Sequence, residues 1–142
     1  MKVKKTVVKI MSLIIVMGAL TCPVYAAEQS CKLLPGSSII VVMPRWTNIS
    51  DIIPAISASG RTVYPEAYVK AQSSTVKITG TMYLEKYSYG KWTRVTSWSI
   101  SGTGSASLSK SYSGTIGTEY RTRIVVTVGS ESAEATSGSC SI

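Results

Sequence analysis

The segment 84–98, LEKYSYGKWTRVTSW, gathers four aromatic and four charged side chains around a single glycine. Aromatic rings next to arginine form a surface that stacks on sugar rings or binds anionic polymers. In an alternating strand Tyr83 and Tyr87 share one face, and Arg121 and Arg123 join them if the later strand that carries them pairs with this one. These four are the candidate binding residues. The alternative, in which they only stabilise strand pairing by a few tenths of a kcal/mol each, stays open.

Other chemistry is limited by composition. The chain has no histidine, which excludes Ser-His-Asp and Cys-His catalysis and histidine-bearing zinc sites. Seven carboxylates with a single aspartate do not suit an oxygen-rich calcium cage. Glu85 and Glu119 could form a glycosidase-type pair, but they are expected beside lysines or arginines on an exposed strand face, where the pKa of a general acid would not rise. We therefore expect no enzyme, no cofactor and no metal site.

The N-terminus is expected to be removed. Residues 1–26 read as a secretory signal peptide, with four lysines, an apolar run over 10–20 and small residues before Ala26. The apolar run is too short to span a bilayer, which needs roughly 20 residues. Cleavage after Ala27 and lipoprotein processing at Cys22 are the alternatives. The sequence thus predicts a secreted protein, released or held at the cell surface, with no transmembrane segment in the mature chain.

Cleavage changes the overall charge and length. The formal charge falls from +8 to +4, because four of the lysines leave with the signal peptide. Subtracting 26 from 142 leaves 116 residues, a size typical of one domain. The mature chain is mildly basic, with acidic residues among the basic ones, so nucleic acid is not an expected partner.

Two cysteines remain after cleavage, Cys31 and Cys140, near the two ends of the mature chain. An exported protein meets an oxidising environment, and one disulfide between them is the simple prediction. Closing a loop of roughly 100 residues would stabilise the fold by about 4–5 kcal/mol in the chain-entropy model. The alternative is two free thiols.

From Ser37 onward the hydrophobic pattern has a period of two and helix formers are sparse, which predicts strands throughout. We expect an N-terminal extended arm over 27–46 and an all-β, immunoglobulin-like antiparallel β-sandwich of about seven strands over 47–142. Pro54 indicates an edge strand or a bulge. The expected strands cover 38–42, 47–59, 62–72, 75–87, 92–100, 106–112 and 119–128, with one more short edge strand at the C-terminal end.

Because side chains alternate between the two faces of a strand, the spacing of the aromatic residues predicts which face of the sheet each one occupies. Trp92 and Trp98 are six residues apart, so an unbulged strand places both on one face, which we interpret as the core. Tyr64 and Tyr68 are expected outside the opposite sheet. In the turn before Trp92, Gly90 is expected to supply the left-handed residue of a type I turn with a bulge.

Four stretches carry a family resemblance: MPRWTNIS (43–50), ITGTMYLEKYSYGKWTRVTSW (78–98), SGTGSASLSKSY and EYRTRIVVTV. Over residues 43–135 the chain resembles a group of small secreted proteins of Clostridia and related Gram-positive Firmicutes, a domain of unknown function. The W-x-x-V-x-S-W hairpin motif formed by Trp92, Val95, Ser97 and Trp98 carries most of it. The resemblance implies a secreted β-sandwich and supplies no activity, substrate or site. The terminal cysteines lie outside the shared pattern.

Taken together, these features favour a non-catalytic extracellular binding module whose partner is a cell-envelope glycan or another extracellular protein. Two alternatives remain: a bacteriocin-like or membrane-active effector, suggested by small size and positive charge, and an enzyme inhibitor, suggested by a disulfide-clamped sandwich. The ligand and the oligomeric state do not follow from the sequence.

Overall fold

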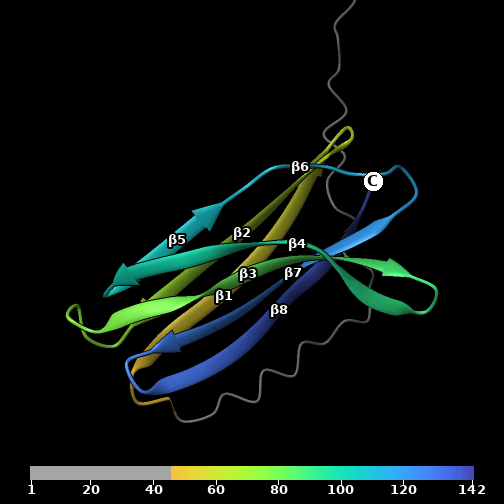
Figure 1. The fold of residues 1–142 in the computed structure, drawn as a ribbon. Coiled ribbons are helices and arrows are strands. Elements are labelled where there is room, and N and C mark those ends of the chain that lie inside the picture. The colour runs from red at the N-terminus through yellow and green to blue at the C-terminus, as the bar shows by residue number, and fades with distance from the viewer. Residues whose placement is uncertain (1–45) are drawn as a thin grey trace, which may run out of the picture.

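The computed structural model describes residues 46–142, and strands make up most of this part of the chain (Figure 1). The all-β prediction is confirmed. The last strand is long, where a short one was expected, and the segment predicted over 106–112 divides in two. The strands are β1 (Ile49–Ser59), β2 (Thr62–Ala71), β3 (Lys77–Ser88), β4 (Lys91–Thr103), β5 (Ser105–Ser109), β6 (Tyr112–Ser113), β7 (Glu119–Val128) and β8 (Glu131–Ser141).

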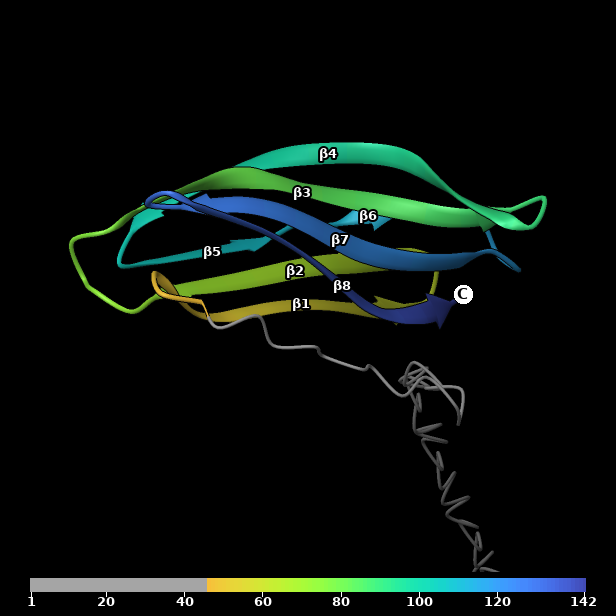
Figure 2. The same cartoon turned by 90° about the horizontal axis from the view of Figure 1, so that it is seen from below.

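The strands form two antiparallel layers that pack against each other as a sandwich (Figure 2). One layer has the order β1-β2-β5, with β6 also paired to β2, and the other has the order β4-β3-β7-β8. The chain passes between the layers at Gly104, whose φ of 73° suits glycine, and β4 meets β5 only at the pair Thr103 and Ser105. The strand 38–42 and most of the predicted arm lie outside the described residues, and the immunoglobulin-like arrangement stays a prediction.

The core follows the predicted alternation. Along β2 every second residue from Val63 to Ala71 is buried while its neighbours are exposed, and β7 buries Tyr120, Thr122 and every second residue after them. Each Val, Leu or Ile buried in this way stabilises the fold by about 1.5–3 kcal/mol. The larger hydrophobic cluster comprises Ile49, Ala67, Val69, Ala71, Ile78, Met82, Ile100, Ala106, Ile124, Val126 and Val128, and the smaller one comprises Val63, Leu84 and Tyr120.

Side chains join the first strand to the last two. The Glu131 carboxylate, at the start of β8, accepts hydrogen bonds from the backbone N–H groups of Thr47, Asn48 and Ile49 at 2.6, 2.6 and 3.3 Å. Thr122 Oγ1 donates to the carbonyl oxygen of Ala55 at 2.8 Å, which links β7 to β1. The first and last strands therefore lie near one another.

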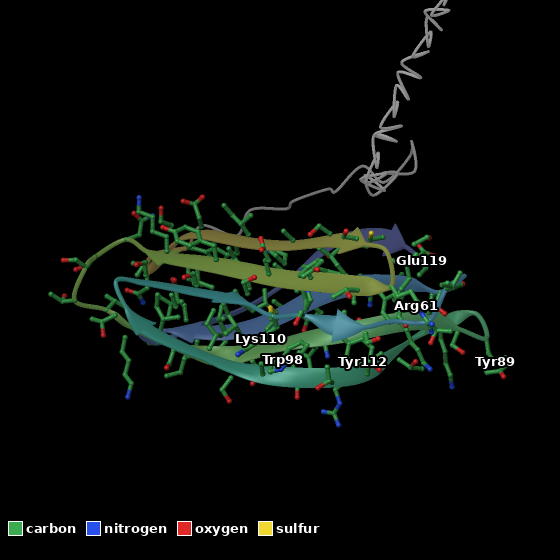
Figure 3. All side chains as sticks on the ribbon, turned by 90° about the horizontal axis from the view of Figure 1, so that it is seen from above. Arg61, Tyr89, Trp98, Lys110, Tyr112 and Glu119 are labelled. Carbon is green, nitrogen blue, oxygen red and sulfur yellow. The ribbon has the colours of Figure 1, made fainter. Side chains whose placement is uncertain are left out.

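The hairpin between β3 and β4 has a two-residue loop. Tyr89 and Gly90 both have positive φ, 51° and 77°, which is the pattern of a type I′ turn. The prediction of a type I turn with a bulge was wrong, because only the primed turn matches the right-handed twist of two strands joined so tightly. Tyr89 is fully exposed and projects from the tip of this hairpin (Figure 3).

Candidate functional site

The four predicted binding residues lie together on the outer face of the β4-β3-β7-β8 sheet. β3 pairs with β7 so that Tyr83 is opposite Arg123 and Glu85 is opposite Arg121. Tyr87 follows two residues after Glu85 on the same face, because side chains on one face of a strand recur every two residues. The pairing on which the prediction depended is therefore present.

A β-bulge brings a fifth residue, Trp92, to this face. Between the pairs Leu84–Thr96 and Glu85–Arg94, β4 has one extra residue, Val95. An extra residue reverses the parity of everything beyond it. Trp92 therefore pairs with Tyr87 on the outside.

The two tryptophans consequently have different environments. Trp98 packs against both hydrophobic clusters and lies between the layers, as predicted (Figure 3). The prediction that Trp92 is a core residue was wrong, because of the bulge at Val95. One signal in the sequence could have revealed it: in an unbulged strand Arg94 would also have pointed into the core, where an unpaired charge is costly.

Aromatic rings and guanidinium groups alternate across the sheet. The Arg121 Cζ lies 4.3 Å from the centroid of the Trp92 ring, and the Trp92 and Tyr87 rings are 5.2 Å apart with a tilt of 57°. The Arg123 Cζ lies 4.5 Å from the centroid of the Tyr83 ring. Both arginines are within the range of cation–π attraction. We call these five residues, Tyr83, Tyr87, Trp92, Arg121 and Arg123, the aromatic–arginine strip.

Glu85 occupies the middle of the strip. Its Oε2 accepts a hydrogen bond from Nε of Arg121 at 2.8 Å and lies 2.8 Å from Nη2 of the same guanidinium, and its Oε1 accepts a hydrogen bond from Nε of Arg123 at 2.7 Å. Arg123 also reaches Glu134, with 3.3 Å between Nη1 and Oε2. Glu85 was expected on an exposed face, which was wrong: it is only 6% exposed because the two arginines cover it.

This pairing sets the protonation of Glu85. Burial by itself would raise the pKa of its carboxyl, but the hydrogen bonds from Arg123 and Arg121 and their positive charges outweigh burial and hold the pKa below its usual range. The hydrogen bond to Glu85 is the main reason that the pKa of Arg123 is raised. A carboxyl with a lowered pKa is ionised at neutral pH and does not suit the role of a general acid.

Charge compensation decides which ligands suit the strip. Within the network the two arginines are balanced by Glu85 and Glu134, and each guanidinium already donates to a carboxylate. An anionic polymer would have to compete with these internal partners. The strip instead offers ring faces and the outer edges of two fixed guanidinium groups, which suits a neutral ligand or a protein surface.

Other candidate features are distributed elsewhere. Tyr64 and Tyr68 lie on the outer face of the other sheet, on β2, as predicted. Among residues 46–142 no group of three metal-ligating side chains comes together. Cys140 is buried, and its predicted partner Cys31 lies outside the described residues, so the disulfide stays a prediction.

Comparisons of the chain with models of protein families, with curated proteins and with solved structures returned no match. The predicted signal peptide, residues 1–26, lies outside the described part of the chain. In the described part, no helix has the length and hydropathy needed to cross a membrane.

Proposed function

We propose that this chain is a secreted, non-catalytic β-sandwich that acts as an extracellular binding module and docks on an envelope polymer or another extracellular protein through the aromatic–arginine strip. The observation that carries the proposal is the outward stacking of Arg121 on Trp92, with Tyr87 beside it. Tryptophan, tyrosine and arginine are the residues that most often dominate binding energy at protein surfaces.

The rigidity of the strip supports this role. Glu85 holds both guanidinium groups through one hydrogen bond from each and a further ion-pair contact with Arg121, so their positions are set before a ligand arrives. A surface that is already ordered loses less side-chain entropy on binding, where each mobile side chain would otherwise cost about 0.5–1.5 kcal/mol. The same pairing compensates the charges of Arg121 and Arg123, so the contribution of these two residues to binding should depend weakly on salt.

Retention on cells tests the proposal. Purified residues 27–142 are incubated with intact cells of the species that encodes the chain and with isolated wall material, at low and high salt. We expect retention that survives high salt. The double variant Tyr83→Ala/Tyr87→Ala removes rings from the strip without removing a partner of Glu85, and it should lose retention at least tenfold.

The matched control is Ile116→Ala, which removes an exposed apolar side chain from the loop between β6 and β7 and should bind to cells as the unsubstituted protein does. Equal thermal unfolding of all variants would show that the fold is intact. Retention that disappears in modest salt, or that is unchanged in the double variant, would show that the strip is not the binding face. Its rings and charges would then serve only to stabilise the sheet.

A further inference from the structure

A groove of about 270 Å³ lies on the outer face of the other sheet, opposite the aromatic–arginine strip. It spans three strands, and the strand register arranges its lining in two neighbouring rows. The first row places Ile53, Tyr68 and Ser107 side by side across β1, β2 and β5. The second row places Ala55, Glu66 and Ser109 in the same order.

The groove results from differences in side-chain size between neighbouring strands. On this face the central strand β2 carries the long side chains of Tyr68 and Glu66, whereas β5 carries the short side chains of Ser107 and Ser109 and β1 carries Ala55 beside Glu66. Tyr68 is 39% exposed and Ile53 is 54% exposed, so an aromatic and an aliphatic surface remain in contact with solvent at one end. The volume lies just below the roughly 300–1,000 Å³ of sites for drug-sized ligands, so it suits a ligand of one or two rings.

Polar side chains also line this groove. Ser109 Oγ donates a hydrogen bond to Oε1 of Glu66 at 3.0 Å, which holds the carboxylate toward β5. Ser107 adds a second hydroxyl in the next row. A fixed carboxylate accepts hydrogen bonds from neighbouring hydroxyl groups of a ligand, and a serine hydroxyl can donate or accept.

The charges of the lining residues favour a neutral ligand over an anionic one. Glu66 is the one charged residue of the lining, and one row further along β2 Lys70 pairs in register with Asp51 of β1. No arginine or lysine lines the groove, so an anionic polymer would meet a carboxylate and no cation there. A neutral sugar matches instead, because it has an apolar ring face for Tyr68 and hydroxyl groups for Glu66 and Ser107.

We infer that this groove is a binding site for a neutral polysaccharide, in which one sugar ring packs on Tyr68 and hydrogen-bonds to the Glu66 carboxylate. Tyr64, 36% exposed, lies four residues away on the same face of β2, about 13 Å along an extended strand, and can contact a further unit of the same chain. The site is separate from the aromatic–arginine strip, and the molecule would then carry a binding face on each sheet.

Native electrophoresis of residues 27–142 in gels that contain a neutral polysaccharide tests the inference. The panel is β-glucan, mannan, xylan and galactan, with polygalacturonate as the anionic control. We expect retardation by at least one neutral polymer and none by polygalacturonate. Tyr68→Ala should weaken that binding at least tenfold, Glu66→Gln should weaken it several-fold, and Tyr68→Phe, which keeps the ring, should bind nearly as the unsubstituted protein does.

Two further variants test whether any loss of binding comes from the groove itself and not from the aromatic–arginine strip. Ser107→Gln fills the groove from β5 without removing the Tyr68 ring, and it should also abolish retardation. Tyr83→Ala, on the opposite sheet, should leave retardation unchanged, so this assay does not depend on the strip. The inference is overturned if no neutral polymer retards the protein, if Tyr68→Ala binds within twofold of the unsubstituted protein, or if Tyr83→Ala weakens binding equally.

Discussion

Replacing Glu85 with glutamine would leave the guanidinium groups of Arg121 and Arg123 together on one sheet face without their shared anion. Two hydrogen bonds, of 2.8 and 2.7 Å, and a further ion-pair contact of 2.8 Å from Arg121 join them to Glu85. Removing one member of a fully buried pair costs roughly 3–5 kcal/mol. Here the arginine side chains are 26% and 25% exposed and water can solvate them in part, so we expect a loss of about 2–3 kcal/mol.

Thermal and denaturant unfolding measure this loss. For a domain near 100 residues, 1 kcal/mol corresponds to roughly 4–8 °C in Tm, so Glu85→Gln should lower Tm by about 10–20 °C. The matched control is Glu134→Gln, which removes another carboxylate partner of Arg123. The Glu134 side chain is 56% exposed, and its loss should cost less than about 0.5 kcal/mol.

The pH dependence gives a second readout. The folded pKa of Glu85 is lowered, so its contribution is complete above the unfolded-state pKa, about 4.3, and is lost as the pH falls through the folded value. The stability difference between the unsubstituted protein and Glu85→Gln should be constant from about pH 7 to pH 5 and shrink below about pH 4. Equal stabilities of Glu85→Gln and Glu134→Gln at pH 7 would refute the network as described.

Three further predictions follow from the fold and a fourth from the cysteines of the sequence. Gly80→Ala should destabilise the domain by about 1–3 kcal/mol in urea unfolding, because the added methyl would overlap a carbonyl oxygen of β7. Tyr89→Asn should stabilise the domain by about 0.5–1 kcal/mol, because asparagine tolerates the left-handed φ of 51° better. Glu131→Gln should lower Tm at pH 7 but have less effect at acid pH, because backbone hydrogen bonds hold the Glu131 pKa below its usual range. Reduction of a Cys31–Cys140 bond should lower Tm, whereas Cys31→Ser should melt identically with and without reductant.

Much of the architecture was predictable because a period of two is a local property of the chain. Alternation in β2 and β7 identified which residues are buried, since each inward side chain must be apolar or satisfied while its neighbours face water. The candidate residues Tyr83, Arg121 and Arg123 were predictable for the same reason, once the pairing of β3 with β7 was assumed. The length of β8 was underestimated because its serines and glycine resemble a loop.

The sequence by itself determined that the domain of residues 46–142 is all-β and that the chain lacks histidine-dependent chemistry, and it determined which face of each regular strand is apolar. Only the tertiary structure decided that Val95 is an extra residue, which moves Trp92 from the core to the surface. It also decided that Glu85 is buried, because the arginines that cover it lie 36 and 38 residues away. The alternation of side chains between the two faces of a strand is a property of neighbouring residues, so the sequence shows it. Bulges and ion pairs depend on which strands lie side by side, and the packing of the whole sandwich decides which strands do.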